Sequence, residues 1–396
     1  MNRQQTQLEK QIIRKINSSP LKRLTFYEFM DLALYEKELG YYTKNKGKIG
    51  KNADFYTSTS VNSIFGRIIA KSFIELFAEI GNNNRDGIFL LEVGGGDGRL
   101  AADILDEYRN NNQEIYHNLT YYMLEISPYH RLAQAERLQE HLEHVQWVSG
   151  FSELPKSFQG IIFSNELLDA FPVHRVVQKH GELKELYVAY DEETQSFQEI
   201  SDELSNPRLG AYFLEQGITL KEGQLAEVNL AAIDWLNSAA VALDKGYILT
   251  IDYGYPASEL YASHRHLGTL MCYHQHLAND NPYQNIGDQD ITAHVNFSIL
   301  EDVGRKLSLE KVWFTTQSTF LINNGILNYL EDIALSDPAT TDFINSQAFK
   351  LNRAIRQLIN PSEMGETFKV LLQQKGIKRQ SYKFFQNVWE KYEGKI

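Results

Sequence analysis

The stretch IFLLEVGGGDGRLAADIL, residues 88–105, joins an apolar run to a helical pattern through a glycine-rich turn. Gly94, Gly96 and Gly98 carry no side chains, so a ligand can approach the backbone of the turn closely. The helix that follows offers unpaired N–H groups at its N-terminus. The stretch therefore predicts a strand, a ligand-binding turn and a helix of the kind found in α/β nucleotide-binding folds.

The chain on both sides of this stretch repeats the alternation of short apolar runs with helical patterns. Apolar runs occur at 88–93, 119–126, 145–148, 160–165 and 246–253. Continuous apolar runs separated by helices are typical of a parallel sheet that is covered on both faces. We therefore predict an α/β fold with a doubly wound, mostly parallel sheet.

Two segments flank the predicted sheet, and two insertions interrupt it. Residues 1–80 are predicted to form an N-terminal helical cap with a lid loop, and residues 321–396 a mainly helical segment packed on the core. The core, 81–320, carries insertions at about 173–225 and 254–300. The first insertion alternates apolar and polar residues around two turn signals, so it predicts an antiparallel hairpin or meander.

Composition argues against several classes of protein. The formal net charge of −12 provides no basic surface to neutralise phosphates, so nucleic acid is a poor candidate partner. No run of residues suits a membrane span or a signal peptide, and Leu8, Ile12 and Ile16 predict an amphipathic helix near the N-terminus instead. The single cysteine, Cys272, suits a reducing compartment. These features predict a cytoplasmic protein that binds no membrane.

The acid at the mouth of the glycine turn indicates which nucleotide it binds. Glu92 lies two residues before Gly94, and the glycines read G-x-G-x-G. A carboxylate there would repel a pyrophosphate but can hold an ammonium group, which favours S-adenosyl-L-methionine over NAD. Gly96, Gly98 and Ala101 also satisfy the G-x-G-x-x-A spacing, so the turn alone leaves a dinucleotide open.

Two later residues extend the predicted cofactor site. Glu125 follows Gly98 by 27 positions at the end of the second apolar run, where an acid accepts hydrogen bonds from ribose hydroxyls. The usual spacing is about 20 residues, and a loop at 110–118 would explain the excess. Phe151, just after the third run, is a candidate to contact adenine; the alternative is a core aromatic residue.

Six further strings point to one family. They are ALYEKELGYYT (33–43), IGKNADFYTS (49–58), FSNELLDAFPVHR (163–175), IDYGY (251–255), DITAHVNF (290–297) and MGETFKVL (364–371). In this order they resemble the MidA-like methyltransferases, a family that includes mitochondrial complex I assembly factors. The similarity runs from about Leu24 to Leu372, nearly the whole chain.

The resemblance implies a class I methyltransferase fold with a seven-stranded sheet and S-adenosyl-L-methionine as the cofactor. It also implies methyl transfer to an arginine of a partner protein. Tyr56, Thr57 and Ser58 resemble the family's lid over the cofactor, and the alternative is a solvated turn. The acceptor protein stays unidentified, and the oligomeric state stays open between a monomer and a homodimer.

The acceptor residues are expected at the carboxyl ends of the strands, where doubly wound sheets bind their ligands. Asn165, Glu166 and Asp169 follow the fourth apolar run. A guanidinium is best held by carboxylates in bidentate geometry. Glu166 and Asp169, three residues apart at the start of a predicted helix, would both face the cleft, and one could take a proton. The alternative is that they cap this helix.

Two residues further along are additional candidates. Glu227 lies near the start of a predicted amphipathic helix, and the resemblance extends to this acid. His294 would accept a proton or pack against the substrate; the alternative is a structural hydrogen bond. The histidines around Cys272 match no standard zinc spacing, so we predict no metal site.

Three other functions compete with a protein methyltransferase. A non-enzymatic assembly factor could keep the cofactor site for stability alone, although Glu92, the glycines and Glu125 are all intact. A small-molecule methyltransferase would also fit, because lids enclose small substrates as well. An NAD-dependent oxidoreductase would use the second glycine spacing.

Overall fold

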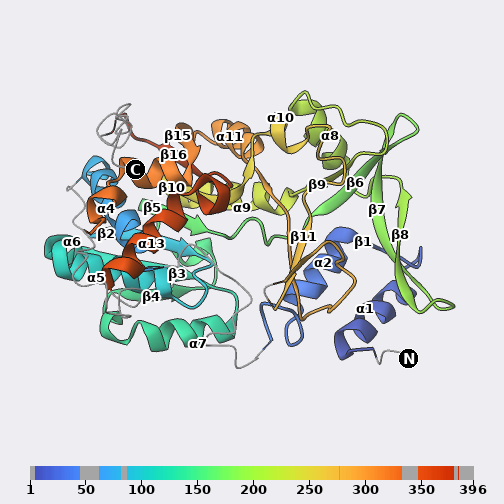
Figure 1. The fold of residues 1–396 in the computed structure, drawn as a ribbon, viewed down its shortest axis with the longest axis horizontal. Helices are drawn as coiled ribbons and strands as arrows, with labels where there is room; N and C mark the ends of the chain where they lie inside the picture. Colours follow the sequence, from blue (N-terminus) through green and yellow to red (C-terminus); the bar gives the residue numbers. More distant parts are fainter. Residues whose placement is uncertain are drawn as a thin grey trace, which may run out of the picture. The chain divides into compact units, whose positions relative to one another are not determined.

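The apolar runs become the strands of a large sheet in the computed structural model, which describes residues 5–44, 62–81, 87–275, 277–331, 347–378 and 382 (Figure 1). The chain divides into two units. Unit 1 is Met1–Phe55, Leu167–Asn237 and Gly254–Val303, and unit 2 is Tyr56–Glu166, Ser238–Tyr253 and Gly304–Ile396. The predicted boundaries at 80 and 320 differ from this division, because the helix at 64–80 packs into the core of unit 2.

Unit 2 is built on a sheet whose described strands follow the order β15-β16-β10-β5-β2-β3-β4. They are β2 (Ile88–Val93), β3 (Leu119–Leu124), β4 (Val145–Val148), β5 (Phe158–Asn165), β10 (Leu243–Tyr255), β15 (Glu310–Thr316) and β16 (Phe368–Lys375). β4, β3, β2, β5 and β10 run parallel, while β16 is antiparallel to both of its neighbours. β14 (Val295–Asn296) pairs with the last residues of β10. The predicted doubly wound, mostly parallel sheet is confirmed.

One face of this sheet packs on four helices in a single apolar core. The helices are α4 (Ile64–Ile80), α5 (Arg99–Asn111), α12 (Gln317–Asn323) and α13 (Gln347–Ile359). Leu90, Ile161 and Leu249 point into this core from three neighbouring strands. Leu91 and Ile162, which point to the opposite face, are also fully buried. Burial on both faces explains why these strands read as continuous apolar runs.

One prediction about local structure in unit 2 was wrong, and another was incomplete. The polar stretch 110–118, predicted as a loop, contains the short helix α6 (Gln113–Asn118), whose Tyr116 is buried and hydrogen-bonded to His141 Nδ1 at 2.9 Å. The segment 321–396, predicted as mainly helical, also contributes β16 to the sheet. Val370 and Leu372 of that strand are buried by the same core, which fixes them in a strand.

Unit 1 contains two smaller sheets with helices of its own. The order of the larger sheet is β1-β7-β6-β9, with β8 also paired to β7, and that of the smaller is β12-β11-β13. The strands are β1 (Leu24–Thr25), β6 (His174–Lys179), β7 (Glu182–Asp191), β8 (Ser196–Asp202), β9 (Leu225–Val228), β11 (Met271–His274), β12 (Leu277–Asn279) and β13 (Asp290–Thr292). β6, β7 and β8 form the antiparallel meander that was predicted within 173–225.

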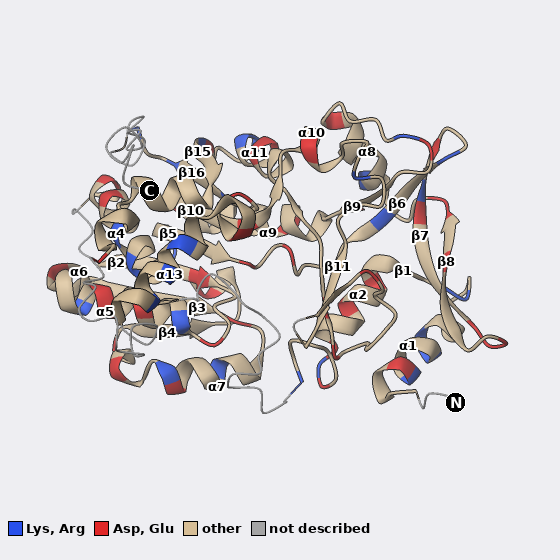
Figure 2. Cartoon of the chain, in the orientation of Figure 1, with Lys and Arg blue, Asp and Glu red and all other residues tan. Residues whose placement is uncertain are grey.

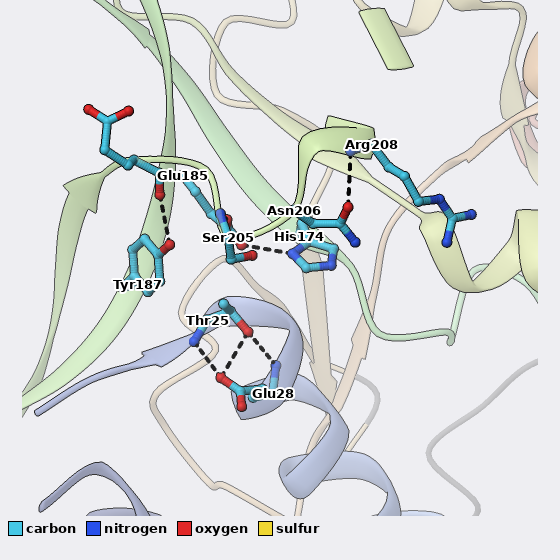
Figure 3. Close-up of polar contacts among 9 residues, drawn as sticks. Thr25, Glu28, His174, Glu185, Tyr187, Ser205, Asn206 and Arg208 are labelled. Carbon is cyan, nitrogen blue, oxygen red and sulfur yellow. Dashed lines mark hydrogen bonds and ion pairs between the residues drawn. The ribbon is translucent and has the colours of Figure 1, made fainter. Parts of the chain in front are cut away.

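Several of the helices that lie wholly or partly in unit 1 begin at a side-chain cap. The helices that lie there are α1 (Gln7–Ser18), α2 (Phe26–Tyr35), α8 (Pro207–Glu215), α9 (Leu230–Ala242), α10 (Ala257–Leu260) and α11 (Phe297–Lys306). Thr25 and Glu28 form a capping box at the start of α2 (Figure 3). The side chain of Asn206 accepts from the backbone N–H of Arg208 at the start of α8. Leu8, Ile12 and Ile16 are buried, as the predicted amphipathic helix requires.

A buried polar pair joins two strands of the larger sheet of unit 1. His174 Nδ1 lies 2.7 Å from Glu185 Oε1, and the backbone N–H of Ser205 donates to the other carboxylate oxygen at 2.6 Å (Figure 3). Tyr27 stacks on the imidazole with ring centroids 5.0 Å apart. These contacts satisfy polar groups inside the unit, as buried polar groups require.

Charged residues of both signs occur along helices such as α5 and α7 (Pro128–Arg137) (Figure 2). No helix in the described ranges is both long enough and apolar enough to span a bilayer.

Candidate functional site

The glycine turn connects β2 to α5 in unit 2. Gly94, Gly96 and Gly98 have φ angles of 71°, 52° and 80°, a backbone region that residues with side chains rarely adopt. A Cβ atom placed on Gly96 would meet no described atom within 4 Å, so the middle of the turn faces open space. A ligand can therefore approach the backbone at Gly96, as the sequence predicted.

Glu92 is a buried acid at the end of β2. Its side chain is 3% exposed, and Tyr121 Oη donates to its Oε2 atom at 2.8 Å. Burial raises the pKa of Glu92 to about 7, the hydrogen bond from Tyr121 opposes this rise, and the carboxylates of Glu125 and Asp97 add to it. A neighbouring ammonium group would offset the cost of ionising this carboxyl.

Glu125 directly follows β3, the strand beside β2. It is 5% exposed, and the backbone N–H of Ser127 donates to Oε1 at 2.8 Å. Gln134 Nε2 donates to Oε2 at 3.3 Å, and His130 Nδ1 lies 3.7 Å from the same oxygen. Each carboxylate oxygen has two acceptor positions, so the group retains capacity for further hydroxyl donors.

Two hydrophobic residues are candidates to contact a nucleobase. Phe151 lies in a 3₁₀ turn, η2 (Phe151–Glu153), shortly after β4, and is half-buried rather than part of the core. Ile126 follows Glu125 directly and is 62% exposed. Sequence reasoning did not select Ile126, although its position immediately after the predicted ribose acid was a usable signal. The predicted lid residues Tyr56, Thr57 and Ser58 lie outside the described residues.

Asn165 and Glu166 lie at the carboxyl end of β5, the neighbour of β2 on its other side. Asn165 Nδ2 donates to Glu166 Oε1 at 3.1 Å, while Asn165 Oδ1 is buried and meets no hydrogen-bond partner among the described residues. Glu166 has a φ of 52°, and its N–H donates to Ile251 O at 2.9 Å. A left-handed non-glycine residue stores backbone strain, which clusters at functional sites.

The helix predicted to begin at Glu166 does not form, which corrects the argument that Glu166 and Asp169 share a helical face. The left-handed backbone at Glu166 excludes this residue from a right-handed helix. The carbonyls that a helix would use are bound by other groups, with Asn229 Nδ2 donating to Leu168 O at 2.8 Å and Ala293 N to Asp169 O at 3.0 Å. The capping alternative falls with the helix.

Asp169, Glu227 and His294 come together in unit 1 through one series of hydrogen bonds. Glu227 Oε2 accepts from Thr269 N at 2.7 Å and from Thr269 Oγ1 at 3.1 Å. His294 N donates to Thr269 Oγ1 at 3.1 Å, and the preceding residue, Ala293, donates to the carbonyl of Asp169. Three segments that are far apart in the sequence therefore meet at Thr269 and Ala293.

Glu227 lies in β9, shortly before α9 begins at Leu230, so the predicted helix follows this acid but does not contain it. Its neighbour across the sheet is Arg175, whose Nε lies 3.9 Å from Glu227 Oε1 and whose Nη1 binds Glu199. Glu227 and Arg175 are each less than 9% exposed. Glu199 compensates the positive charge of Arg175 only in part. The remaining charge explains why an acid, Glu227, occupies the buried strand position beside Arg175.

Three residues that bind the candidate side chains within their own units were missed by sequence reasoning. Tyr121 binds Glu92, Gln134 binds Glu125, and Thr269 links Glu227 to His294. Each acts on a partner from another segment, so no local pattern marks it. Among the described residues, no group of three or more His, Cys, Asp or Glu side chains is arranged to hold a metal ion.

Comparisons with known proteins identify the family of the chain. The sequence profile of a family described as "Putative S-adenosyl-L-methionine-dependent methyltransferase" matches residues 68–315. A crystal structure of a COG1565 superfamily member from Burkholderia thailandensis, bound to S-adenosyl-homocysteine, is 29% identical and has a TM-score of 0.84. The match covers 96% of this chain and 94% of that one. The predicted fold class and the predicted family resemblance are confirmed.

Two curated relatives carry a more specific name, mitochondrial protein arginine methyltransferase NDUFAF7. The protein from Danio rerio is 27% identical, over 89% of this chain and 86% of the relative. The protein from Homo sapiens is 25% identical, over 87% of this chain and 78% of the relative. The prediction of a cytoplasmic protein is wrong against these relatives, because their names place them in mitochondria; one cysteine and acidic composition do not distinguish the two compartments.

Proposed function

The chain belongs to the family of S-adenosyl-L-methionine-dependent methyltransferases, and on that premise we propose that it methylates an arginine side chain of a partner protein. One observation carries the proposal. β5, β2 and β3 are neighbours in the sheet, and their carboxyl ends present Glu166, Glu92 and Glu125 around the glycine turn. Ligands of doubly wound sheets lie at this edge.

The cofactor fits the residues at the ends of β2 and β3. Glu92 would hold the ammonium of the methionine moiety, which offsets the unfavourable burial of its carboxylate. Glu125 would accept hydrogen bonds from the ribose hydroxyls. The nucleoside would lie beside the backbone of Gly96, where no side chain blocks it. Phe151 and Ile126 are proposed for the adenine, and Tyr56, Thr57 and Ser58 for a lid. The cofactor supplies an electrophilic methyl group on a sulfonium.

Asn165 and Glu166 are proposed to hold the acceptor guanidinium. The carboxylate of Glu166 pairs with its N–H groups, and the buried Oδ1 of Asn165 can accept one more. Transfer forms a nitrogen–carbon bond, breaks the sulfur–carbon bond and leaves one proton surplus on the guanidinium. Glu166 takes this proton, or passes it to water, so that the methylated side chain keeps a single positive charge.

Asp169, Glu227 and His294 are proposed to serve acceptor binding as a second group. His294 would contact the acceptor, while Glu227 holds the backbone of His294 through Thr269. The names of the curated relatives support arginine as the methylated residue and a protein as the substrate.

The proposal is tested by supplying the protein with isotopically labelled S-adenosyl-L-methionine and host lysate, followed by mass spectrometry. We expect label on arginine residues of a discrete protein. Label confined to small molecules would replace the protein acceptor with a metabolite. Absence of labelled product, together with micromolar binding of S-adenosyl-homocysteine by calorimetry, would instead favour an assembly factor that binds cofactor without turnover. Calorimetric binding of NAD alone would support an oxidoreductase.

The role of Glu166 is tested by Glu166→Gln. Because the amide neither pairs with the guanidinium charge nor takes its proton, methyl transfer should fall by roughly 100-fold or more, with the affinity for S-adenosyl-homocysteine nearly unchanged. Glu140→Gln is the matched control, since Glu140 is an exposed acid of unit 2 paired with Arg109. Unchanged turnover of Glu166→Gln would remove Glu166 from the mechanism.

A further inference from the structure

Gln134 lies on α7 in unit 2, and both the nitrogen and the oxygen of its side-chain amide form hydrogen bonds. Its side chain is fully buried, and Nε2 donates to Gly96 O at 2.8 Å and to Glu125 Oε2 at 3.3 Å. Oε1 accepts from Trp147 Nε1 at 2.9 Å. An indole N–H can only donate and a carbonyl can only accept, so these partners leave the amide one orientation.

The same helix holds the glycine turn at a second point. Arg137, three residues after Gln134, donates from Nε to Asp97 O at 3.0 Å and from Nη2 to Asp97 Oδ2 at 2.8 Å. A Cβ atom on Gly98 would lie 3.2 Å from Gln134, so the turn and the helix are in close contact. α7 therefore restrains the turn through Gly96, Asp97 and Gly98.

The acid is restrained by the segment that begins this helix. Ser127 is the N-cap of α7, and its backbone N–H donates to Glu125 Oε1. Gln134 lies two turns further along and donates to Oε2. The carboxylate of Glu125 is thus held at both oxygens from one helix, which determines the plane in which its remaining acceptor positions lie.

We infer that Gln134 is a positioning residue that sets the selectivity of the site for a nucleoside with both ribose hydroxyls. The inference rests on the proposed function of Glu125 and deepens it. The carboxylate of Glu125 can accept from both ribose hydroxyls at once only when its plane is fixed. Each hydroxyl must point at a lone pair of a carboxylate oxygen. Gln134 fixes this plane and joins it to Gly96, so that sugar and turn keep a constant separation.

The chemistry of this position requires an amide. A glutamate would direct carboxylate oxygens at Glu125 and at the carbonyl of Gly96, where like charge and unpaired acceptors are unfavourable. A methionine of similar length would fill the space but leave Gly96 O and Trp147 Nε1 without their partner. Only a group that both donates twice and accepts once satisfies all three neighbours.

The test compares Gln134→Met with Gln317→Met by calorimetry, using S-adenosyl-homocysteine and its 2′-deoxy analogue as probes. Gln317 is the matched control because it is a fully buried glutamine of unit 2 that binds a backbone carbonyl, Leu358 O at 3.2 Å. We expect the wild type and Gln317→Met to prefer the ribose compound by roughly tenfold or more. In Gln134→Met the preference should fall to within about threefold, mainly through loss of affinity for the ribose compound.

If Gln134 had only a structural role, Gln134→Met would weaken the binding of both compounds equally and leave the ratio of their affinities unchanged. That result would overturn the inference. Failure of the wild type to bind S-adenosyl-homocysteine would instead overturn the proposed cofactor site. This outcome is distinct from a change in the ratio of the two affinities. Should Gln134→Met fold poorly in thermal melts, Trp147→Phe keeps an aromatic six-membered ring at this position and removes the indole N–H that orients the amide, together with the five-membered ring that carries it. It should reduce the preference part of the way, and an unchanged ratio would count against Gln134.

The dependence on Glu125 is checked in a double-mutant cycle. Glu125→Gln should itself abolish most of the preference for the ribose compound, and adding Gln134→Met should change the ratio little further. Additive effects on the ratio would show that Gln134 acts independently of Glu125 and would contradict the inference.

Discussion

The candidate acids of unit 2 and those of unit 1 are positioned in different ways. Glu92, Glu125 and Glu166 each stand at the carboxyl end of a strand, and the three strands are neighbours in one parallel sheet. Asp169 and Glu227 lie in separate segments of unit 1 and are connected through Ala293 and Thr269. The first set depends on sheet register, and the second on contacts between distant segments. Substitution of Glu92 or Glu125 should therefore affect cofactor binding, and substitution of Glu166 should affect methyl transfer. Substitution of Asp169 or Glu227 should affect acceptor binding or stability.

The largest effect on cofactor binding is expected from Glu92→Gln. Loss of the carboxylate should weaken S-adenosyl-homocysteine binding by about 100-fold, the scale of a buried charge-assisted hydrogen bond. The pKa of Glu92 is raised from 4.5 to about 7 in the folded protein. Folding therefore favours the protonated form, and the unliganded protein loses stability as pH rises from about 4.5 to about 7.

The same substitution should consequently stabilise the unliganded protein at pH 8, by up to about 3 kcal/mol. Thermal melts at pH 5 and pH 8 measure this, with the wild type as reference. The gain should appear at pH 8 and be small at pH 5. A loss of stability at pH 8 would show that the ionised carboxylate is compensated within the unliganded protein.

The second prediction concerns the pH dependence of cofactor affinity. Binding of an ammonium group requires ionised Glu92, so affinity for S-adenosyl-homocysteine should fall as pH decreases below about 7, by about tenfold per unit. Tyr121→Phe removes the hydrogen bond that lowers the pKa of Glu92, and should move the midpoint to higher pH. Calorimetry from pH 5.5 to pH 8.5 measures both profiles. Affinity independent of pH in the wild type would exclude Glu92 as the titrating group.

Glu227→Gln probes the acids of unit 1. It leaves Arg175 with Glu199 as its remaining described acidic partner, so stability should fall by about 1–3 kcal/mol. Binding of S-adenosyl-homocysteine should be unchanged, whereas methyl transfer should fall because Thr269 and His294 lose a fixed partner. Glu199→Gln is the matched control, since it disturbs Arg175 without contacting Thr269. Equal loss of transfer in both variants would assign the effect to Arg175.

The smallest effect is expected from Asp103→Asn in α5. Burial raises the pKa of Asp103 to about 7, and the nearby Arg99 opposes this rise. The folded protein therefore loses stability between about pH 4 and pH 7 as this half-buried acid ionises. The amide should stabilise unit 2 by about 1 kcal/mol or less at pH 8, after allowance for solvent screening. Chemical denaturation at pH 8 measures the gain, and cofactor affinity should not change.

The five parallel strands were predictable because burial on both faces of a parallel sheet demands uninterrupted apolar runs. The glycine turn and the two acids near it were predictable for a similar reason. Their spacing follows from strand length and from the helix that covers each strand. The turn at Glu166–Asp169 was not predictable from the sequence. Local composition indicates a left-handed residue only when that residue is glycine.

Residue order along the chain was enough to assign the five parallel strands, the glycine turn and the positions of Glu92 and Glu125. These depend on short-range periodicity and on the uniform geometry of strand–turn–helix units. The roles of Gln134 and Thr269, and the strand position of Glu227, became visible only in the folded chain. Each of these side chains is defined by hydrogen-bond partners from distant segments, and folding rather than local propensity brings such partners within 3 Å or so.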